Sequence, residues 1–256
     1  HPEPSESYKK GNKRALSQEI RKARSLSDGL IGVNIMVALS DYDELLETAL
    51  DEDVDFLFLG AGLPLKFPDS IPPERLRRTR SKIVPIVSSA KAASLILRHW
   101  SKRFQHVPDG FVVEGPKAGA HLGFKPEQID DPSYDLSRLI PEVVQTVSPY
   151  AGRYLKSIPV IAAGGIYTGA DIYDFLELGA QGVQLGTRFV ATHECDADIK
   201  FKEAYVRSRQ EDLTIIQSPV GLPGRALNNE FLQDVASGER KPFKCPWKCL
   251  KTCDHK

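Results

Sequence analysis

The sequence predicts an α/β protein of the TIM (β/α)8-barrel type. Six short apolar segments alternate along the chain with segments whose apolar residues recur every three or four positions. Apolar strands separated by helices indicate a parallel sheet that is covered on both faces. Three of the strands run into glycine-rich turns, as strand ends do where a barrel holds its ligand. The alternative is an open doubly wound sheet, which usually has a GxGxxG turn after its first strand; residues 31–39 lack one.

The expected elements follow one another between residues 17 and 185. Helical periodicity predicts helices over 17–24, 42–50, 90–100, 136–147 and 169–178, of which the first is short. The predicted strands cover 30–37, 55–59, 83–87, 110–113, 159–163 and 182–185. A closed barrel has eight strands, and nothing before Leu30 has strand character, so we expect one or two N-terminal βα units to be missing from this chain.

We expect a single barrel domain over residues 1–256, with residues 190–256 as a C-terminal extension of helices and loops. A helix is predicted over 196–210. Residues 217–225 contain two prolines and two glycines, which predicts an ordered loop that can cover the strand ends as a lid. A short helix and three cysteines, Cys245, Cys249 and Cys253, follow. Metal and cluster sites normally have a fourth ligand and CxxC spacing, so no metal is expected.

Composition argues for a small-molecule partner. The chain has 34 basic and 34 acidic residues and no run of five like charges, which disfavours binding to nucleic acid or to an anionic membrane. No apolar stretch approaches eighteen residues, and the first twenty-five residues are polar, so neither a transmembrane helix nor a signal peptide is expected. A soluble cytoplasmic protein with reduced cysteines fits these observations.

Two consecutive strand ends predict a phosphate site. Gly164 and Gly165 follow the strand at 159–163, and Gly186 and Thr187 follow the strand at 182–185. Backbone amides at such ends bind anions, and glycine lets the backbone come close to the ligand. One Gly-Gly pair alone is more simply a tight turn, but the repetition favours an anion. Gln184, within the second strand, can bond a polar ring edge.

His121 is the candidate general base. It lies eight residues beyond Val113, in a loop between Gly119 and Gly123, where an imidazole is free to take a proton at physiological pH. The alternative is a histidine that only bonds a neighbouring carbonyl. Asn34 stands in an apolar strand, where an amide needs a partner; it either faces a bound ring or caps a turn.

Together these residues resemble the nitronate monooxygenase family, formerly called 2-nitropropane dioxygenases, and the related flavin-dependent enoyl-acyl-carrier-protein reductases. The likeness covers residues 31–225 and rests on GVN at 32–34, EGPKAGAHLG at 114–123, AAGGI at 162–166 and QLGT at 184–187. It implies FMN in a TIM barrel, with His121 as the base toward substrate. The cofactor contacts that it implies are Asn34, Gly119, Gly165, Gln184, Leu185, Gly186 and Thr187.

The chain departs from this family pattern at three places. Ala120 stands where the family usually has glycine, so a methyl group intrudes where the backbone is expected to bend around ligand. Glu114 replaces a glutamine found in many members and puts a carboxylate near the flavin. The family's first strand, with its Gln-Gly-Gly-Met-type turn, and its second glycine-rich strand are absent, in accord with the count of six units.

The expected function is an FMN-dependent oxidoreductase that oxidises nitronates or nitroalkanes with dioxygen. One alternative is an enoyl-acyl-carrier-protein reductase in which NAD(P)H reduces the flavin. An alternative from another class is a non-catalytic barrel that binds flavin or another phosphate. The expected partners are a small-molecule substrate and dioxygen, and a homodimer is a further expectation.

Overall fold

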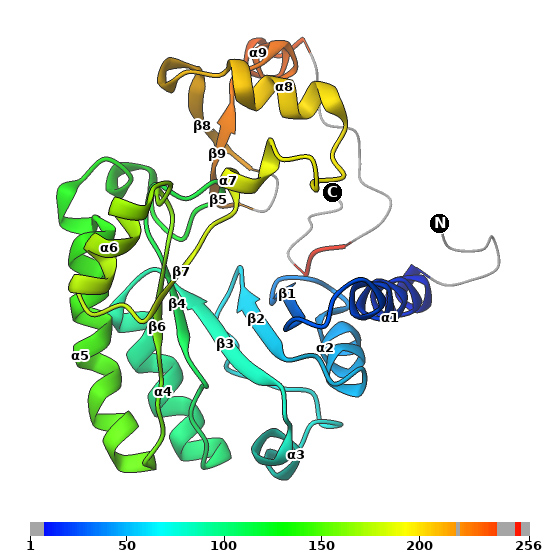
Figure 1. Ribbon diagram of the computed structural model, residues 1–256, viewed down its shortest axis with the longest axis vertical. Helices are drawn as coiled ribbons and strands as arrows, with labels where there is room; N and C mark the ends of the chain where they lie inside the picture. Colours follow the sequence, from blue (N-terminus) through cyan, green and yellow to red (C-terminus); the bar gives the residue numbers. More distant parts are fainter. Residues whose placement is uncertain (1–7, 219–220, 240–248, 252–256) are drawn as a thin grey trace.

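A computed structural model describes residues 8–218, 221–239 and 249–251 (Figure 1). Its main sheet has six parallel strands that lie side by side in the order β1-β2-β3-β4-β6-β7. Their bounds are β1 Gly32–Met36, β2 Phe56–Gly60, β3 Lys82–Val87, β4 Phe111–Glu114, β6 Val160–Ala163 and β7 Gly182–Gln184. The sheet curls but does not close, because β1 and β7 are its two edges. The predicted α/β class and the partial barrel are therefore confirmed.

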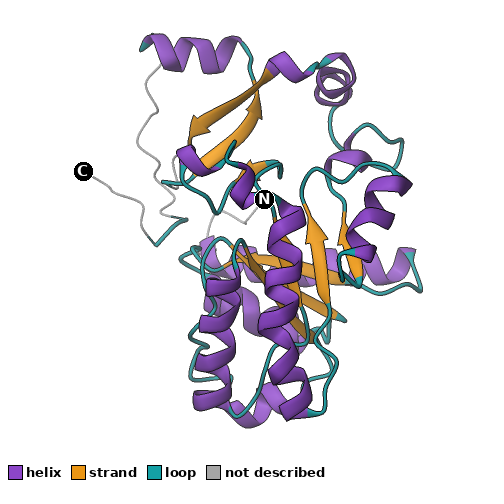
Figure 2. Ribbon diagram, turned by 90° about the vertical axis from the view of Figure 1, so that its left-hand side faces the viewer, coloured by secondary structure: helices purple, strands orange, loops and turns teal. Residues whose placement is uncertain are grey.

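Helices cover the outer face of the sheet (Figures 1 and 2). They are α1 Tyr8–Leu26, α2 Tyr42–Asp51, α3 Pro73–Arg78, α4 Ala90–Phe104, α5 Leu136–Tyr154 and α6 Gly169–Glu177. The short helix α3 was not predicted, because six residues are too few to show helical periodicity. None of the helices in the described ranges is long and apolar enough to cross a membrane.

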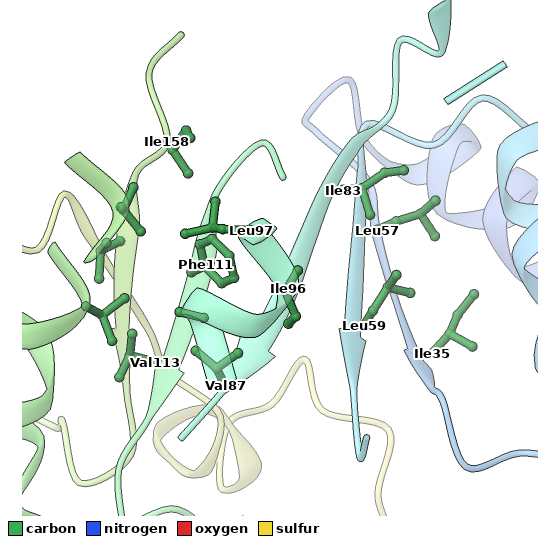
Figure 3. Packing of buried hydrophobic residues seen from close by; sticks show 14 of the residues in the cluster. Ile35, Leu57, Leu59, Ile83, Val87, Ile96, Leu97, Phe111, Val113 and Ile158 are labelled. Carbon is green, nitrogen blue, oxygen red and sulfur yellow. The ribbon is translucent and has the colours of Figure 1, made fainter. Parts of the chain in front are cut away.

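Side chains alternate between the two faces of each strand. Outward-facing Leu57, Leu59 and Ile83 are fully buried against helices such as α4, where Ile96 and Leu97 pack (Figure 3). Inward-facing residues form a second, smaller cluster around three buried side chains, Val84, Val112 and Ala163. The residues at the open side of this cluster, Phe56 and Phe58, are only half-buried. The prediction of a sheet covered on both faces therefore holds fully only for the outer face.

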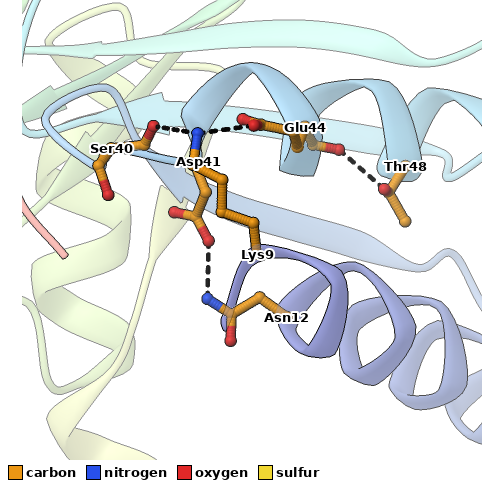
Figure 4. A network of polar contacts seen from close by, with 6 residues as sticks. All are labelled: Lys9, Asn12, Ser40, Asp41, Glu44 and Thr48. Carbon is orange, nitrogen blue, oxygen red and sulfur yellow. Dashed lines mark hydrogen bonds and ion pairs between the residues drawn. The ribbon is translucent and has the colours of Figure 1, made fainter. Parts of the chain in front are cut away.

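Polar contacts tie α1 to the first βα unit (Figure 4). Asn12 Nδ2 donates to Asp41 Oδ2 at 2.7 Å, and Lys9 Nζ forms a 2.7 Å ion pair with Glu44. Lys9 also donates to the carbonyl of Ser40 at 3.2 Å. The helix was expected only over 17–24 because its first half is polar and lacks periodicity. Contacts with α2 explain why it begins nine residues earlier, at Tyr8.

A second, antiparallel sheet lies beyond the carboxyl ends of the strands, at the top of Figure 1. Its order is β5-β9-β8, formed by β5 Ala120–His121, β9 Pro223–Leu227 and β8 Leu213–Gln217. The prediction of a loop over 217–225 is therefore wrong at both ends, because Gln217 is the last residue of β8 and residues 223–225 begin β9. Pro223 is tolerated because it is the first residue of its strand.

Three more helices complete this part of the chain, α7 Thr187–Val190, α8 Ile199–Arg207 and α9 Glu230–Ser237. The helix predicted over 196–210 is shorter, since Asp198 caps its start by accepting a hydrogen bond from the amide of Lys200. Of the three cysteines near the end, Cys245 and Cys253 lie outside the described residues. Cys249 is described, and its carbonyl accepts a 2.9 Å bond from the amide of Ser40.

Candidate functional site

A polar row crosses the carboxyl ends of three neighbouring strands. Glu114 of β4 pairs in register with Ala163 of β6, which pairs with Gln184 of β7. Register partners in a parallel sheet point to the same face, and Ala163 belongs to the inner-face cluster. A carboxyl group and an amide therefore flank a methyl group on the inner face, with neighbouring strands about 4.8 Å apart.

The turn after β6 has the backbone shape that its glycines permit. Gly164 and Gly165 have φ values of 98° and 77°. The turn also packs tightly, because a Cβ on Gly164 would lie 2.9 Å from the amide nitrogen of Ala118, and one on Gly165 would lie 2.9 Å from Lys117 Cβ. Both glycines are thus required by a close approach of two loops as well as by a turn.

Backbone amides at the two turns are free to bind an anion. Within the described chain, the amides of Gly165 and Gly186 donate to no other backbone group. The first turn of α6, in contrast, is occupied by a capping box between Thr168 and Asp171. The available donors are therefore those of the strand-end turns and not those of the α6 terminus.

These turns line a cavity of about 510 Å³, here called the turn cavity. Its lining includes Gly164, Gly165, Gln184, Leu185, Gly186 and Thr187. Two cationic side chains, Lys117 and Arg225, also line it, and a methyl group at Gly119 would lie 3.8 Å from Thr187 Oγ1. Free amides, a hydroxyl group and two cations suit a phosphate group.

A second cavity, of about 380 Å³, adjoins the first and is here called the histidine cavity. Asn34, Gly60, Ser88, His121 and Leu222 are among the residues that line it. Both cavities share Glu114, Gly119 and Ala120. A ligand with a phosphate at one end and a flat ring at the other fits this pair of adjoining spaces.

His121 lies on β5 and faces the histidine cavity. Its backbone pairs with Gly224, and the following residue Leu122 donates to the carbonyl of Pro223 at 2.8 Å. On the other side of the loop, Gly123 packs so closely on Ser88 that a Cβ there would collide with the hydroxyl. The imidazole makes no hydrogen bond to any residue in the described ranges, so the alternative of a bond to a neighbouring carbonyl is not seen.

The environment of the Asn34 side chain differs from the one expected. It is exposed on the inner face of β1, beside Phe58 in the pairing register. The expectation of a buried amide is wrong because the sheet is open beside β1, and the described residues provide no turn that its side chain caps. Its place on the wall of the histidine cavity remains consistent with an amide that faces a bound ring.

Glu114 is held in a weakly solvated position. Burial raises the pKa of Glu114 from 4.5 to about 7, with desolvation as the cause. No hydrogen bond connects its carboxyl group to the described part of the chain. The group therefore takes up and releases a proton near neutral pH at the junction of the two cavities.

Ala120 has a left-handed backbone conformation. Its φ is 59°, a region in which a Cβ costs roughly 1–2 kcal/mol. Its side chain is exposed at the shared wall of the two cavities. The methyl group therefore strains the loop that carries His121.

The family model of nitronate monooxygenase matches residues 18–253. The chain belongs to the nitronate monooxygenase family. It is 34% identical over 133 residues to a probable nitronate monooxygenase of Staphylococcus aureus, a match that covers 51% of this chain and 35% of the relative. The chain thus aligns with about a third of the length of that relative.

Two solved structures in this fold are similar over most of the chain. FabK from Thermotoga maritima has a TM-score of 0.71 and 29% identity, over 89% of this chain and 63% of that one. The nitroalkane oxidase of Streptomyces ansochromogenes has a TM-score of 0.68 and 25% identity, over 87% of this chain and 68% of that one.

In this member of the nitronate monooxygenase family, all ten site residues predicted from sequence line one or both cavities. Those at the turn cavity are Gly164, Gly165, Gln184, Leu185, Gly186 and Thr187, those at the histidine cavity are Asn34 and His121, and those at both are Glu114 and Gly119. Their roles remain proposals. Among the described residues, no group of three or more His, Cys, Asp or Glu side chains is placed to hold a metal.

Sequence reasoning missed Arg225. It belongs to a segment expected to be a loop, and its contacts lie 107 and 109 residues away in the chain. No local pattern reports such contacts. The only signal was a single charged residue among the glycines and prolines of 217–225.

Proposed function

We propose that this chain is the FMN-binding catalytic unit of an oxidoreductase that oxidises nitronates or nitroalkanes with dioxygen. The observation that carries the proposal is the adjoining pair of cavities, one lined by anion-binding turns and the other by His121. Membership of the nitronate monooxygenase family and the likeness to a nitroalkane oxidase support it.

In this proposal the turn cavity holds the phosphate of FMN. Gly164 lines it, the amides of Gly165 and Gly186 and the Thr187 hydroxyl would donate to it, and Lys117 would complement its charge. Glu114, Gly119, Gln184, Leu185 and Asn34 are the residues that would hold the flavin ring. When bound, FMN accepts two electrons from the substrate and passes them to dioxygen.

His121 takes the proton from the substrate carbon next to the nitro group. Its imidazole has no partner within the described residues and faces the cavity, so a nitrogen is available to a substrate held there. Imidazole is the side chain that ordinarily exchanges protons near neutral pH. A nitronate has already lost that proton, so its oxidation does not need this base.

A FabK-type enoyl reductase is the second candidate, supported by the likeness to FabK. Anaerobic mixing of the FMN-loaded chain with each reductant separates the two. We expect bleaching of flavin absorbance by ethyl nitronate alone, without a nicotinamide. Rapid bleaching by NADH with no response to nitronate would favour the enoyl reductase.

The third candidate, a non-catalytic flavin-binding barrel, is tested by His121→Ala. A general base contributes roughly 10²–10⁴-fold, so we expect a loss of that size in kcat/KM for nitroethane, with flavin absorbance retained. Turnover of preformed nitronate serves as the control, because it bypasses the base. An unchanged rate with nitroethane would remove His121 from the mechanism.

A further inference from the structure

The loop that carries His121 is held by the β8–β9 hairpin. Ala120 pairs with Arg225 and His121 pairs with Gly224 in an antiparallel ladder. This pairing covers only the two residues of β5. Two backbone pairs alone hold a short strand weakly, so side-chain contacts matter for the loop's shape.

Arg225 adds such contacts. Its Nε donates to the carbonyl of Ala118 at 3.2 Å, and its Nη2 donates to the carbonyl of Pro116 at 3.0 Å. No carboxylate of the described chain forms an ion pair with it. The planar guanidinium group suits two acceptors with fixed spacing, which a lysine ammonium group cannot bond in the same way.

The loop that carries His121, and whose carbonyls Arg225 bonds, also has a strained backbone. Ala120, with a φ of 59°, lies between the carbonyls that Arg225 bonds and the His121 imidazole. Left-handed residues other than glycine persist where surrounding contacts fix them. Arg225 and the ladder supply those contacts, on the side of the loop that lines both cavities.

We infer that Arg225 is a positioning residue: by bonding the carbonyls of Pro116 and Ala118, it holds the strained loop so that the His121 imidazole faces the substrate cavity. This inference rests on the proposed function for its catalytic consequence. Arg225 itself exchanges no proton with the substrate. Its contribution is to the placement of the base, and misplacement of a reacting group by about 1 Å costs roughly 10²-fold in rate.

Arg225→Lys tests the inference, because it keeps the charge and most of the length of the side chain but not the paired bonds. We expect kcat/KM for nitroethane to fall roughly 10- to 100-fold, while oxidation of preformed ethyl nitronate changes far less. Arg207→Lys is the matched control, since Arg207 is an exposed arginine of α8 that pairs with Glu203. The control is expected to match the parent protein with both substrates.

Hydrogen exchange gives a readout that does not depend on activity. In Arg225→Lys we expect faster exchange of amides over 117–122, including Leu122, with β4 unchanged as an internal reference. Unchanged exchange in this segment, or equal losses with nitroethane and nitronate, would overturn the inference. If the parent protein oxidises neither substrate, the proposed function fails, and the exchange result still decides whether Arg225 holds the loop.

Discussion

At the residue scale, the site combines a proton-exchanging carboxyl group with a strained loop. Glu114 lies at the junction of the cavities with its pKa raised to about 7 by burial. Ala120, next to His121, has a φ of 59°. Each of these two residues has a cost to folding that can be measured.

Glu114 makes stability depend on pH. Between pH 4.5 and about 7 the folded chain binds a proton that the unfolded chain has released, so stability falls as pH rises through this range. One pKa unit corresponds to about 1.4 kcal/mol, so the full penalty above pH 7 is at most about 3.5 kcal/mol. We expect Glu114→Gln to remove it.

Urea unfolding of both proteins without FMN measures this effect. The two stabilities are expected to be similar at pH 4.5, with the glutamine variant more stable at pH 8. A variant that is less stable than the parent at pH 8 would show that the carboxylate is solvated or paired in the folded protein.

Ala120→Gly relieves the strain at φ 59°. Relief of roughly 1–2 kcal/mol is offset by the greater backbone entropy of glycine, about 0.5–1 kcal/mol. We expect a net gain in unfolding free energy of up to about 1 kcal/mol. Ala191→Gly, at an exposed residue with a φ of −90°, has no strain to relieve and is expected to lose stability. Equal losses in both variants would contradict the assignment of strain.

At the element scale, the short turn after β6 has two roles. It lines the turn cavity, and it packs against the loop at Lys117 and Ala118. That second loop is the one held by β9 through Arg225. The strand ends, the turn and the hairpin therefore form one packed assembly around the site.

Gly165→Ala disturbs this assembly. The added methyl group has both an unfavourable φ of 77° and a contact at 2.9 Å with Lys117 Cβ. We expect a loss of about 1–3 kcal/mol in unfolding free energy and weaker FMN binding, measured by fluorescence titration. Gly169→Ala is the control, because no atom lies within 4 Å of its added methyl group. Similar behaviour of the two variants would show that the turn tolerates a side chain.

At the scale of the whole molecule, burial is unevenly distributed. Most of the fully buried side chains, such as Trp100 and Phe111, lie between the sheet and its outer helices. In contrast, α7, α8 and α9 contain no buried residue. Local stability follows buried apolar contact, so the part beyond the strand ends is expected to open more easily than the sheet.

Native-state hydrogen exchange over the whole chain tests this order. We expect amides of α8 and α9 to exchange at lower free energies than those of β2, β3 and β4. Saturating FMN is expected to slow exchange in the turns at 164–165 and 186–187, which line the turn cavity. Equal protection of the α8 and β3 amides from exchange would contradict this expected order of local stability.

The α/β class, the six parallel strands and the glycine-rich strand ends could all be predicted from the amino-acid sequence. These features are local, because runs such as residues 83–87 and the pair Gly164-Gly165 carry their own periodicity or backbone requirement. The predicted phosphate site at Gly164, Gly165, Gly186 and Thr187 also follows from strand ends, since parallel strands bring their carboxyl ends to one edge, whereas Gly119 and Leu185 came only from the resemblance to the family.

The way the His121 loop is held and the exposure of the inner face could not be predicted from the sequence. The hairpin ladder to β5 and the bonds of Arg225 join residues more than a hundred positions apart, and no local pattern encodes such pairing. The exposure of Asn34 and the raised pKa of Glu114 depend on the residues that surround each of these side chains in the folded protein. Solvation and long-range pairing are properties of the assembled molecule, so they appear only once the chain is folded.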